Sequence, residues 1–242
     1  NIVGQQNVLI SKIKSLKFNS LIDVINDLSY YVCENSLSVE GWSLAKNQIA
    51  TIVEKLQKKA VFLSEYVNNQ IYLGIKTGCN EAFVIDKNIK EYLVRTDPNN
   101  QLFIMSLIVG DDLRKYEIKN RDLYLLLIPW GWTKQKIDTD QEKLAWNYLS
   151  SLYPSLTKHL EGFAEKARKR CDQGQFWWEL RSCTYYDIFE KPKIIYPDIA
   201  KESRFTLDNN GFYSINTTYL IPSQSYYLLA LLNSSLIFFY MS

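Results

Sequence analysis

The spacing of apolar residues changes near residue 67, and this change constrains the fold more than any other feature of the sequence. Before it, apolar residues recur at helical intervals, which predicts amphipathic helices. The longest such stripe, from Leu44 to Leu63, predicts one helix of about twenty residues over roughly 42–66. After it come short apolar runs typical of strands, so we expect a helical N-terminal segment followed by a mixed domain, an α+β fold.

Several strands are expected in this second part. Runs at 70–75 and 81–85 flank the turn-rich segment Thr77–Asn80 and predict a β-hairpin. A turn at Asp208–Gly211 predicts a second hairpin. The other expected strands, including the two joined by that turn, are 123–128, 176–180, 193–199, 204–207 and 212–215.

Three helices are also expected there. Thr139–Glu142 forms a capping-box pattern that predicts a helix to about Tyr153. Pro154 is tolerated only in a first helical turn, so it opens a second helix. Ser223 is expected to cap a final helix over about 224–240.

The overall charge excludes a strong global attraction to polyanions. The chain has 28 Lys and Arg against 26 Asp and Glu, a formal net charge of +2. Nucleic-acid binding would therefore depend on local clusters of positive charge. A content of 47% hydrophobic and 22% charged residues is typical of a folded domain and excludes disorder and coiled-coil arrays.

Residues of the usual catalytic and metal-binding kinds are scarce. His159 is the single histidine and the four cysteines form no C-x-x-C pair, so we expect no metal centre and no disulfide framework. The sequence shows no signal peptide, and its apolar run at 226–240 is interrupted by Asn233 and Ser234, too soon to cross a bilayer. We expect a cytoplasmic protein without membrane contact, and the abrupt apolar end indicates a segment of a longer chain.

Motifs of common enzymes are absent from the sequence. It contains no G-x-x-x-x-G-K-[ST], G-x-G-x-x-G or G-x-S-x-G, and no Asn/Asp-Pro-Pro-Tyr/Phe tetrapeptide of amino-group methyltransferases. We therefore expect no catalytic residues and no cofactor in this segment.

Four stretches occur together and in a fixed order. They are GIKTGCNEAFVID at 74–86, IVGDDLRKY at 108–116, FWWELR at 176–181 with KPKIIYP at 191–197, and YLLALLNS at 227–234. In this order they resemble the TaqI-like C-terminal specificity domain, the target-recognition part of adenine-specific DNA methyltransferases and of fused (type IIG) restriction–modification enzymes. The resemblance covers the chain from about Trp42 to its end. In the second stretch, Val109 and Asp111 stand where the family has arginines.

The resemblance implies a DNA target-recognition domain over 68–242, a long linker helix over 41–67 and, over 1–40, a helical connection from a catalytic domain. It implies sequence-specific recognition of double-stranded DNA. The duplex would be positioned for base flipping by an S-adenosylmethionine-dependent methyltransferase domain of the same prokaryotic polypeptide. The parent would be a site-specific adenine DNA methyltransferase, with or without endonuclease activity, whereas this segment would have no turnover. A separate recognition module is needed because a pocket that holds one flipped adenine cannot read the neighbouring base pairs.

The strongest local cluster of positive charge ends at Arg168, Lys169 and Arg170. These residues would clamp phosphate beside the polar loop 171–175, or they are only the solvated end of a helix whose dipole favours cations. Arg181 would read a base or form a salt bridge with Glu179.

Two further groups are candidates for DNA contact. Lys76, Thr77 and Asn80 lie at the expected hairpin tip, where they would contact DNA or only form the turn. The resemblance implies phosphate contacts for Arg114 and Lys115, with a solvated loop as the alternative.

Tryptophans are the remaining candidates. Trp130 and Trp132 flank Gly131 in a turn, where an exposed ring would stack on a base or wedge into the duplex. Trp177 and Trp178 lie in an expected strand, so one ring should point inward and the other, which we expect to be Trp178, outward to DNA. The alternative for these tryptophans is a position in the core, where tryptophans of strands more often lie.

Two other functions remain open from the sequence. The near-neutral charge and the amphipathic helices also suit a protein–protein interaction module of a multi-subunit assembly. A stand-alone enzyme would require two carboxylates that converge in a deep pocket.

Overall fold

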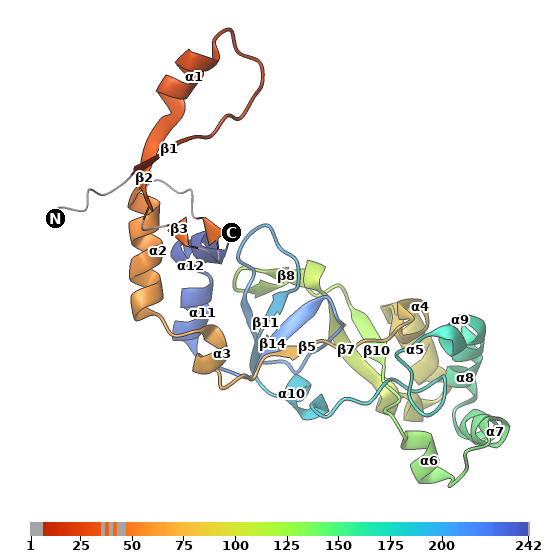
Figure 1. Cartoon of the computed structure of the whole chain (residues 1–242). Coiled ribbons are helices and arrows are strands. Elements are labelled where there is room, and N and C mark those ends of the chain that lie inside the picture. Colours follow the sequence, from red (N-terminus) through yellow and green to blue (C-terminus); the bar gives the residue numbers. More distant parts are fainter. Residues whose placement is uncertain (1–6, 35–36, 39–40, 43–46, 242) are drawn as a thin grey trace. The chain divides into compact units, whose positions relative to one another are not determined.

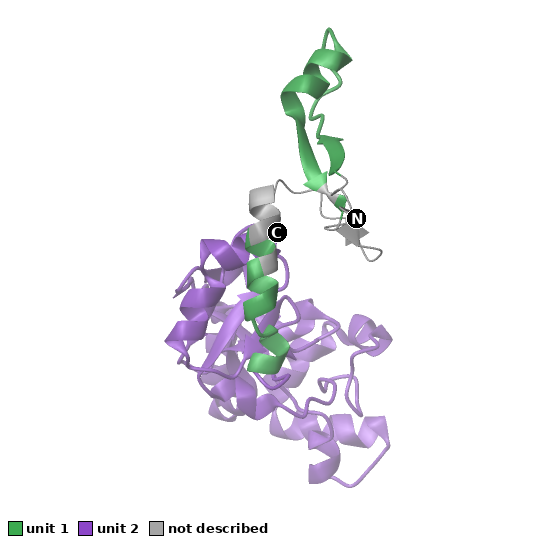
Figure 2. Ribbon diagram, turned by 60° about the vertical axis from the view of Figure 1, so that its left-hand side comes forward, with its two compact units in different colours: residues 1–66 green, residues 67–242 purple. Residues whose placement is uncertain are grey.

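The computed structural model describes residues 7–34, 37–38, 41–42 and 47–241. The chain forms two compact units, residues 1–66 and residues 67–242 (Figure 1, Figure 2). The α+β class expected from the sequence is confirmed, because helices and mainly antiparallel strands both build the second unit.

The first unit begins with a strand, a helix and a strand. β1 (Asn7–Ser11) pairs antiparallel with β2 (Ser29–Cys33). Between them lies α1 (Leu21–Leu28), whose N-cap Ser20 accepts a hydrogen bond from the backbone N–H of Asp23 at 3.3 Å. The other elements of this unit are β3 (Leu37–Ser38), β4 (Gly41–Trp42), α2 (Asn47–Lys59) and α3 (Leu63–Tyr66).

Two expectations for this unit need correction. Residues 1–40 are not purely helical, because β1 and β2 pair through the β-branched and aromatic residues that favour strands. The expected single helix over 42–66 ends at Lys59 and resumes at Leu63, and its first turn at 43–46 lies outside the described residues. Val61 and Phe62 at the break are of types that lose side-chain freedom in helices, and both are exposed, so no packing offsets this cost.

Two four-stranded sheets form the centre of the second unit. The first has the order β13-β7-β10-β6 and the second the order β12-β11-β14-β5. All pairs are antiparallel except β13 with β7, which is parallel. The strands are β5 (Tyr72–Leu73), β6 (Val84–Ile85), β7 (Ile104–Ile108), β10 (Leu123–Leu126), β11 (Lys193–Pro197), β12 (Thr206–Asp208), β13 (Tyr213–Ser214) and β14 (Thr218–Ile221), with a separate ribbon of β8 (Leu113–Arg114) and β9 (Glu117–Ile118).

Helices and loops complete one hydrophobic core around these sheets. Phe83, Leu107, Leu125, Trp178 and Ile195 are among its fully buried members and come from a helix, from both sheets and from a loop. The helices are α4 (Asn80–Phe83), α5 (Lys87–Thr96), α6 (Trp132–Lys136), α7 (Glu142–Leu152), α8 (Pro154–Glu161), α9 (Ala164–Lys169), α10 (Tyr186–Glu190), α11 (Tyr226–Leu232) and α12 (Ser235–Met241), with 3-10 turns η2 (Pro98–Phe103) and η3 (Gly110–Asp112).

The two sheets are linked by the backbone at Gly74 and Ile75. Gly74 donates to the carbonyl of Thr218 at 2.9 Å, and Ile75 donates to that of Ser214 at 2.8 Å. A Cβ at position 74 would lie 2.1 Å from the carbonyl oxygen of Ile215. Glycine is therefore required there by the close approach of two backbones.

Both expected hairpins are wrong. β5 joins β14 while β6 joins β10, in a different sheet, because the turn between them continues into α4. In the second case β12 pairs with β11 while β13 pairs with β7. There the Asp208 carboxylate accepts hydrogen bonds from the backbone N–H groups of Asn210 and Phe212, at 2.8 and 3.0 Å, and turns the chain away.

Of the other strands and helices expected from the sequence, some are confirmed and some are wrong. β10 and β11 confirm the strands expected at 123–128 and 193–199, and Pro154 opens α8 as expected. No strand forms at 176–180, where the chain makes a tight loop. The final helix breaks into α11 and α12, because the buried Asn233 amide pairs with both the N–H and the carbonyl of Phe205.

Both expected helix caps are also wrong. α7 begins at Glu142, and Thr139 instead accepts a hydrogen bond from the backbone N–H of Gln141 at 3.2 Å. Ser225 caps α11 by accepting from the N–H of Leu228, while Ser223 accepts from the N–H of Ser225.

One ion pair lies wholly inside the second unit. The Lys193 ammonium and the Asp208 carboxylate are 2.5 Å apart and neither side chain is exposed to solvent. The ammonium also donates to the carbonyl of Phe189. Burial lowers the pKa of Lys193, and the adjacent carboxylate opposes this effect. The pair joins β11 to β12 and to the end of α10.

We predict that Lys193→Met destabilises the protein by about 3–5 kcal/mol, because it leaves the Asp208 charge buried without its partner. The measurement is the free energy of unfolding in urea. Lys191→Met is the matched control, because Lys191 and Asp187 are each 62% exposed and such pairs contribute less than about 1 kcal/mol. Equal midpoints for the two variants would contradict the prediction.

Candidate nucleic-acid interface

The side chain of Arg170 ties two loops together in the second unit. Only 7% of the residue is exposed, and its guanidinium donates to the carbonyls of Thr77, Trp177 and Glu179. It also lies over the ring of Phe83, with 4.3 Å between the guanidinium carbon and the ring centroid. Burial lowers the pKa of Arg170 to about 10, which leaves it charged at neutral pH. A buried charge of this kind requires such acceptors.

The carboxylate of Glu179 ties a third loop to the same place. It is fully buried and accepts hydrogen bonds from the backbone N–H groups of Gly131, Thr133 and Gln175, at 2.9, 2.9 and 3.0 Å. Gly131 has a φ of 74°, the left-handed region that glycine adopts without strain. We call Arg170 and Glu179, with the segments 76–80, 129–135 and 171–180 that they hold, the loop junction.

The outer side of the loop junction carries polar and aromatic groups. A shallow depression of about 190 Å³ is lined by Trp130, Gly131, Lys134, Gln135 and Gln175. Trp130 is 49% exposed, and both glutamines are exposed. These side chains therefore lie at the surface on backbone that is fixed from beneath.

The tryptophan candidates divide by burial. Trp130 is exposed, as a stacking or wedging role requires, whereas Trp132 packs edge-on against Phe103 at 5.0 Å between ring centroids. Trp178 is fully buried and donates from Nε1 to Thr133 at 2.9 Å. Trp177 is also buried, so the expected outward tryptophan is wrong, because the segment is a loop and does not alternate like a strand.

The expected phosphate clamp at the end of α9 also needs correction. Arg170 is buried and its guanidinium points inward to backbone carbonyls. Arg168 forms an ion pair with Glu142 and lies over the ring of Trp177, and Lys169 pairs with Glu165 at 2.7 Å. The cluster is therefore largely neutralised by its own neighbours.

The hairpin tip expected at 76–80 is a turn that is stabilised by hydrogen bonds of buried groups. Thr77 is 2% exposed, and its hydroxyl donates to the side-chain oxygen of Asn80. Lys76 is half-buried. Arg181 forms its ion pair with Asp172, at 2.9 Å, and not with Glu179. Thr77 and Asn80 thus form the turn, which was the alternative left open for them.

Three basic residues, Arg114, Lys115 and Lys119, lie on or directly beside the ribbon of β8 and β9, where Glu117 stands across from Arg114. Arg114 donates to the backbone carbonyls of Asp111 and Leu113, at 2.9 and 2.7 Å. Lys115 lies over the ring of Tyr116, with 5.6 Å between the ammonium nitrogen and the ring centroid. In the part of the chain that the structure describes, no ion pair involves Arg114, Lys115 or Lys119.

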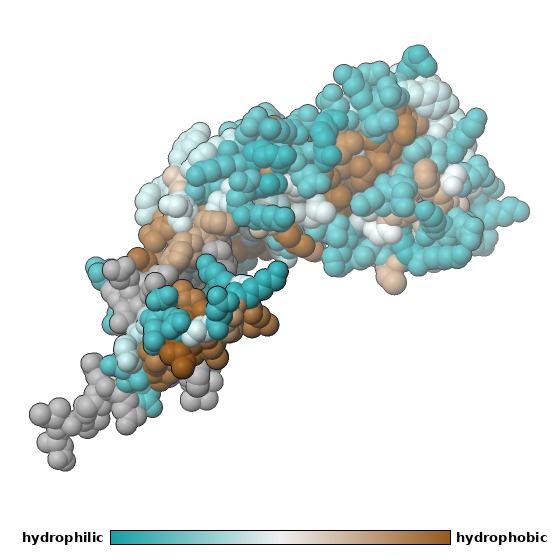
Figure 3. Space-filling view, turned by 90° about the horizontal axis from the view of Figure 1, so that it is seen from above, coloured by the Kyte–Doolittle hydropathy of each residue, from teal (hydrophilic) through white to brown (hydrophobic). Residues whose placement is uncertain are grey.

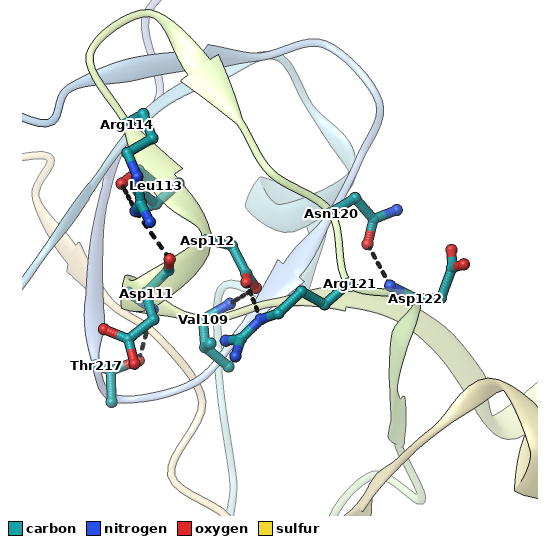
Figure 4. A network of polar contacts seen from close by, with 10 residues as sticks. Val109, Asp111, Asp112, Leu113, Arg114, Asn120, Arg121, Asp122 and Thr217 are labelled. Carbon is teal, nitrogen blue, oxygen red and sulfur yellow. Dashed lines mark hydrogen bonds and ion pairs between the residues drawn. The ribbon is translucent and has the colours of Figure 1, made fainter.

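A buried aspartate fixes the base of this ribbon. Asp112 is 1% exposed, accepts from the backbone N–H of Val109 at 2.9 Å and forms an ion pair with Arg121 (Figure 4). The N–H of Lys119 donates to the carbonyl of Asp112 at 2.7 Å. Lys119 and Arg121 were not expected from the sequence, although the basic run from 114 to 121 could have indicated them. Glu179 was expected only as a salt-bridge partner of Arg181, and no local pattern in the sequence indicates its buried role at the loop junction.

The remaining chemical groups add little to this interface. Burial lowers the pKa of His159, whose Nε2 lies 3.0 Å from the carbonyl oxygen of Ala82. Cys79, Cys171 and Cys183 are free thiols. Among the described residues, no three His, Cys, Asp or Glu side chains are grouped as a metal would require, and no helix has the length and apolar character to cross a membrane.

The fold and this surface define an α+β domain whose polar side chains are carried on rigidly held loops and on the ribbon of β8 and β9. Residues 105–242, more than half of the chain, match the family described as the TaqI-like C-terminal specificity domain. The chain belongs to this family, and the ribbon of β8 and β9 lies within the matched region.

Two other comparisons complete this result. No curated protein matches the chain. Among solved structures, the chain is similar to the type IIL restriction–modification enzyme MmeI in complex with DNA, with 14% identity and a TM-score of 0.44. The match covers 68% of this chain and 20% of the MmeI chain, so this chain spans about a fifth of that enzyme's length.

We predict that Glu179→Gln loosens the loop junction, because an amide nitrogen cannot accept the hydrogen bonds that one carboxylate oxygen accepts now. Each hydrogen bond to a charged group contributes about 1.5–3 kcal/mol. Hydrogen exchange should become faster at the backbone amides of Gly131, Thr133 or Gln175. Glu165→Gln is the control, since the side chain of Glu165 is 86% exposed. Unchanged protection at all three amides would disprove the role of the carboxylate.

Proposed function

We propose that this chain recognises a specific sequence in double-stranded DNA for an adenine-specific DNA methyltransferase or a fused (type IIG) restriction–modification enzyme. The observation that carries the proposal is the family match over 105–242, because that family is described as a specificity domain. The unpaired cations of the β8–β9 ribbon support it, since phosphate contacts fix a protein's register on the duplex.

The division of labour in the parent protein follows from the chemistry of base flipping. An enzyme that modifies a base must take it out of the stack, and its pocket then holds that base alone. The neighbouring base pairs must be read in the major groove, where each has a distinct pattern of donors and acceptors. We infer that a methyltransferase domain of the same polypeptide binds S-adenosylmethionine and performs the reaction, in the cytoplasm of a prokaryotic cell.

A second candidate function, protein–protein interaction, is favoured by the first unit. None of the described residues of α1 is buried, and Ile22 and Leu16 are 70% and 89% exposed. Figure 3 shows hydrophobic residues at the surface among hydrophilic ones. Contiguous exposed apolar surface marks interaction sites. Such a surface is also what a recognition module would need for contact with its methyltransferase domain.

We predict that the 242-residue chain binds duplex DNA at about 50 mM salt and that the logarithm of its affinity falls linearly with the logarithm of salt concentration. The combined change Arg114→Gln, Lys115→Gln and Lys119→Gln should reduce the magnitude of this slope by about 2–3, because each lost phosphate contact removes about 0.9. Fluorescence anisotropy with labelled duplex measures both quantities.

The control is the combined change Lys87→Gln and Lys191→Gln, which removes two exposed lysines that have acidic partners. It should leave the slope within about half a unit of the original, because these lysines make no phosphate contact in the proposal. Absence of duplex binding at about 50 mM salt, where phosphate contacts count most, would overturn the proposed function and favour protein–protein interaction.

A further inference from the structure

Two glutamine side chains line the same depression at the outer side of the loop junction. Gln135 lies on α6 and Gln175 on the loop before Trp177, and both line the depression beside Trp130. Both side chains are exposed, and among the described residues neither amide forms a hydrogen bond with the protein. Their donors and acceptors are therefore available to a ligand.

The backbone beneath these amides is fixed by one buried group. The N–H of Gln175 donates to the Glu179 carboxylate, and the same carboxylate holds Gly131 and Thr133 at the start of α6. The N–H of Gln135 donates to the carbonyl of Gly131 at 3.1 Å. Both glutamines thus have little backbone freedom to lose on binding, which favours recognition over loose contact.

The charged residue that lines the depression, Lys134, has an acidic partner. The ammonium of Lys134 lies 2.5 Å from the Asp140 carboxylate. The unpaired cations of the second unit that we assign to phosphate lie elsewhere, on the β8–β9 ribbon. A neutral surface of amides beside an aromatic ring is suited to base edges, whereas a cationic one is suited to phosphates.

We propose that Gln135 and Gln175 are specificity-determining residues that recognise adenine in the major groove. A glutamine amide presents one donor and one acceptor side by side, and these match N7 and the N6 amino group of adenine. This inference rests on the proposed function and adds to it the residues that read sequence and the base that they select.

The test uses the 242-residue chain and a library of duplexes with a randomised central segment. We would compare the sequences bound by the unaltered chain with those bound by Gln135→Ala, Gln175→Ala and the control Gln70→Ala, an exposed glutamine before β5. Each of the first two variants should lose about tenfold preference for adenine at one position, while preferences at other positions and the salt dependence stay unchanged. Gln70→Ala should change nothing.

A charged substitution sharpens the test. Gln175→Glu replaces the amide with a group that only accepts hydrogen bonds, so the preference at its position should move from adenine towards cytosine, whose N4 amino group donates. Retained adenine preference in Gln135→Ala and Gln175→Ala would overturn this inference and leave the proposed function intact. Binding of the unaltered chain without any sequence preference would overturn both. Circular dichroism checks that each variant is folded.

Discussion

Two buried charges of opposite sign, Arg170 and Glu179, hold the loop surface of this protein in place. A charge taken out of water must be surrounded by hydrogen-bond partners, and here the partners are backbone groups of three separate loops. The guanidinium of Arg170 donates hydrogen bonds to backbone carbonyls, and the carboxylate of Glu179 accepts them from backbone N–H groups. Each charged group therefore has several hydrogen-bond partners from different parts of the chain. The cost of burying each charge is therefore offset only when all three loops adopt this one arrangement.

The distribution of surface charge separates two tasks. Most surface cations with a described contact have an acidic partner, as Arg168 has in Glu142 and Arg181 in Asp172. The β8–β9 ribbon instead carries cations that form no ion pair within the described part of the chain, and the buried Asp112 anchors it at its base. A chain with a net charge of only +2 can thus keep a few cations free of ion pairs on one surface, while a second surface presents neutral amides suited to base edges.

Local patterns predicted the elements that depend on local chemistry. The apolar run at 123–128 forms β10, whose second half is buried, and Pro154 opens α8, because a continuous apolar run and the fixed φ of proline are properties of the segment itself. Both hairpins failed for the opposite reason. A short strand beside a turn pairs with whichever strand the rest of the chain places next to it. Here β5 pairs with β14 and β13 pairs with β7, both far away in the sequence.

The sequence by itself determined the α+β class and the family, since these depend on the period of apolar residues and on the order of four motifs. Only the tertiary structure decided what each polar side chain does. Arg168, Lys169 and Arg170 are consecutive basic residues, yet two lie in surface ion pairs and the third is buried at the loop junction. Charge is a property of a residue, whereas its availability to a ligand depends on which neighbours the fold places within hydrogen-bonding distance.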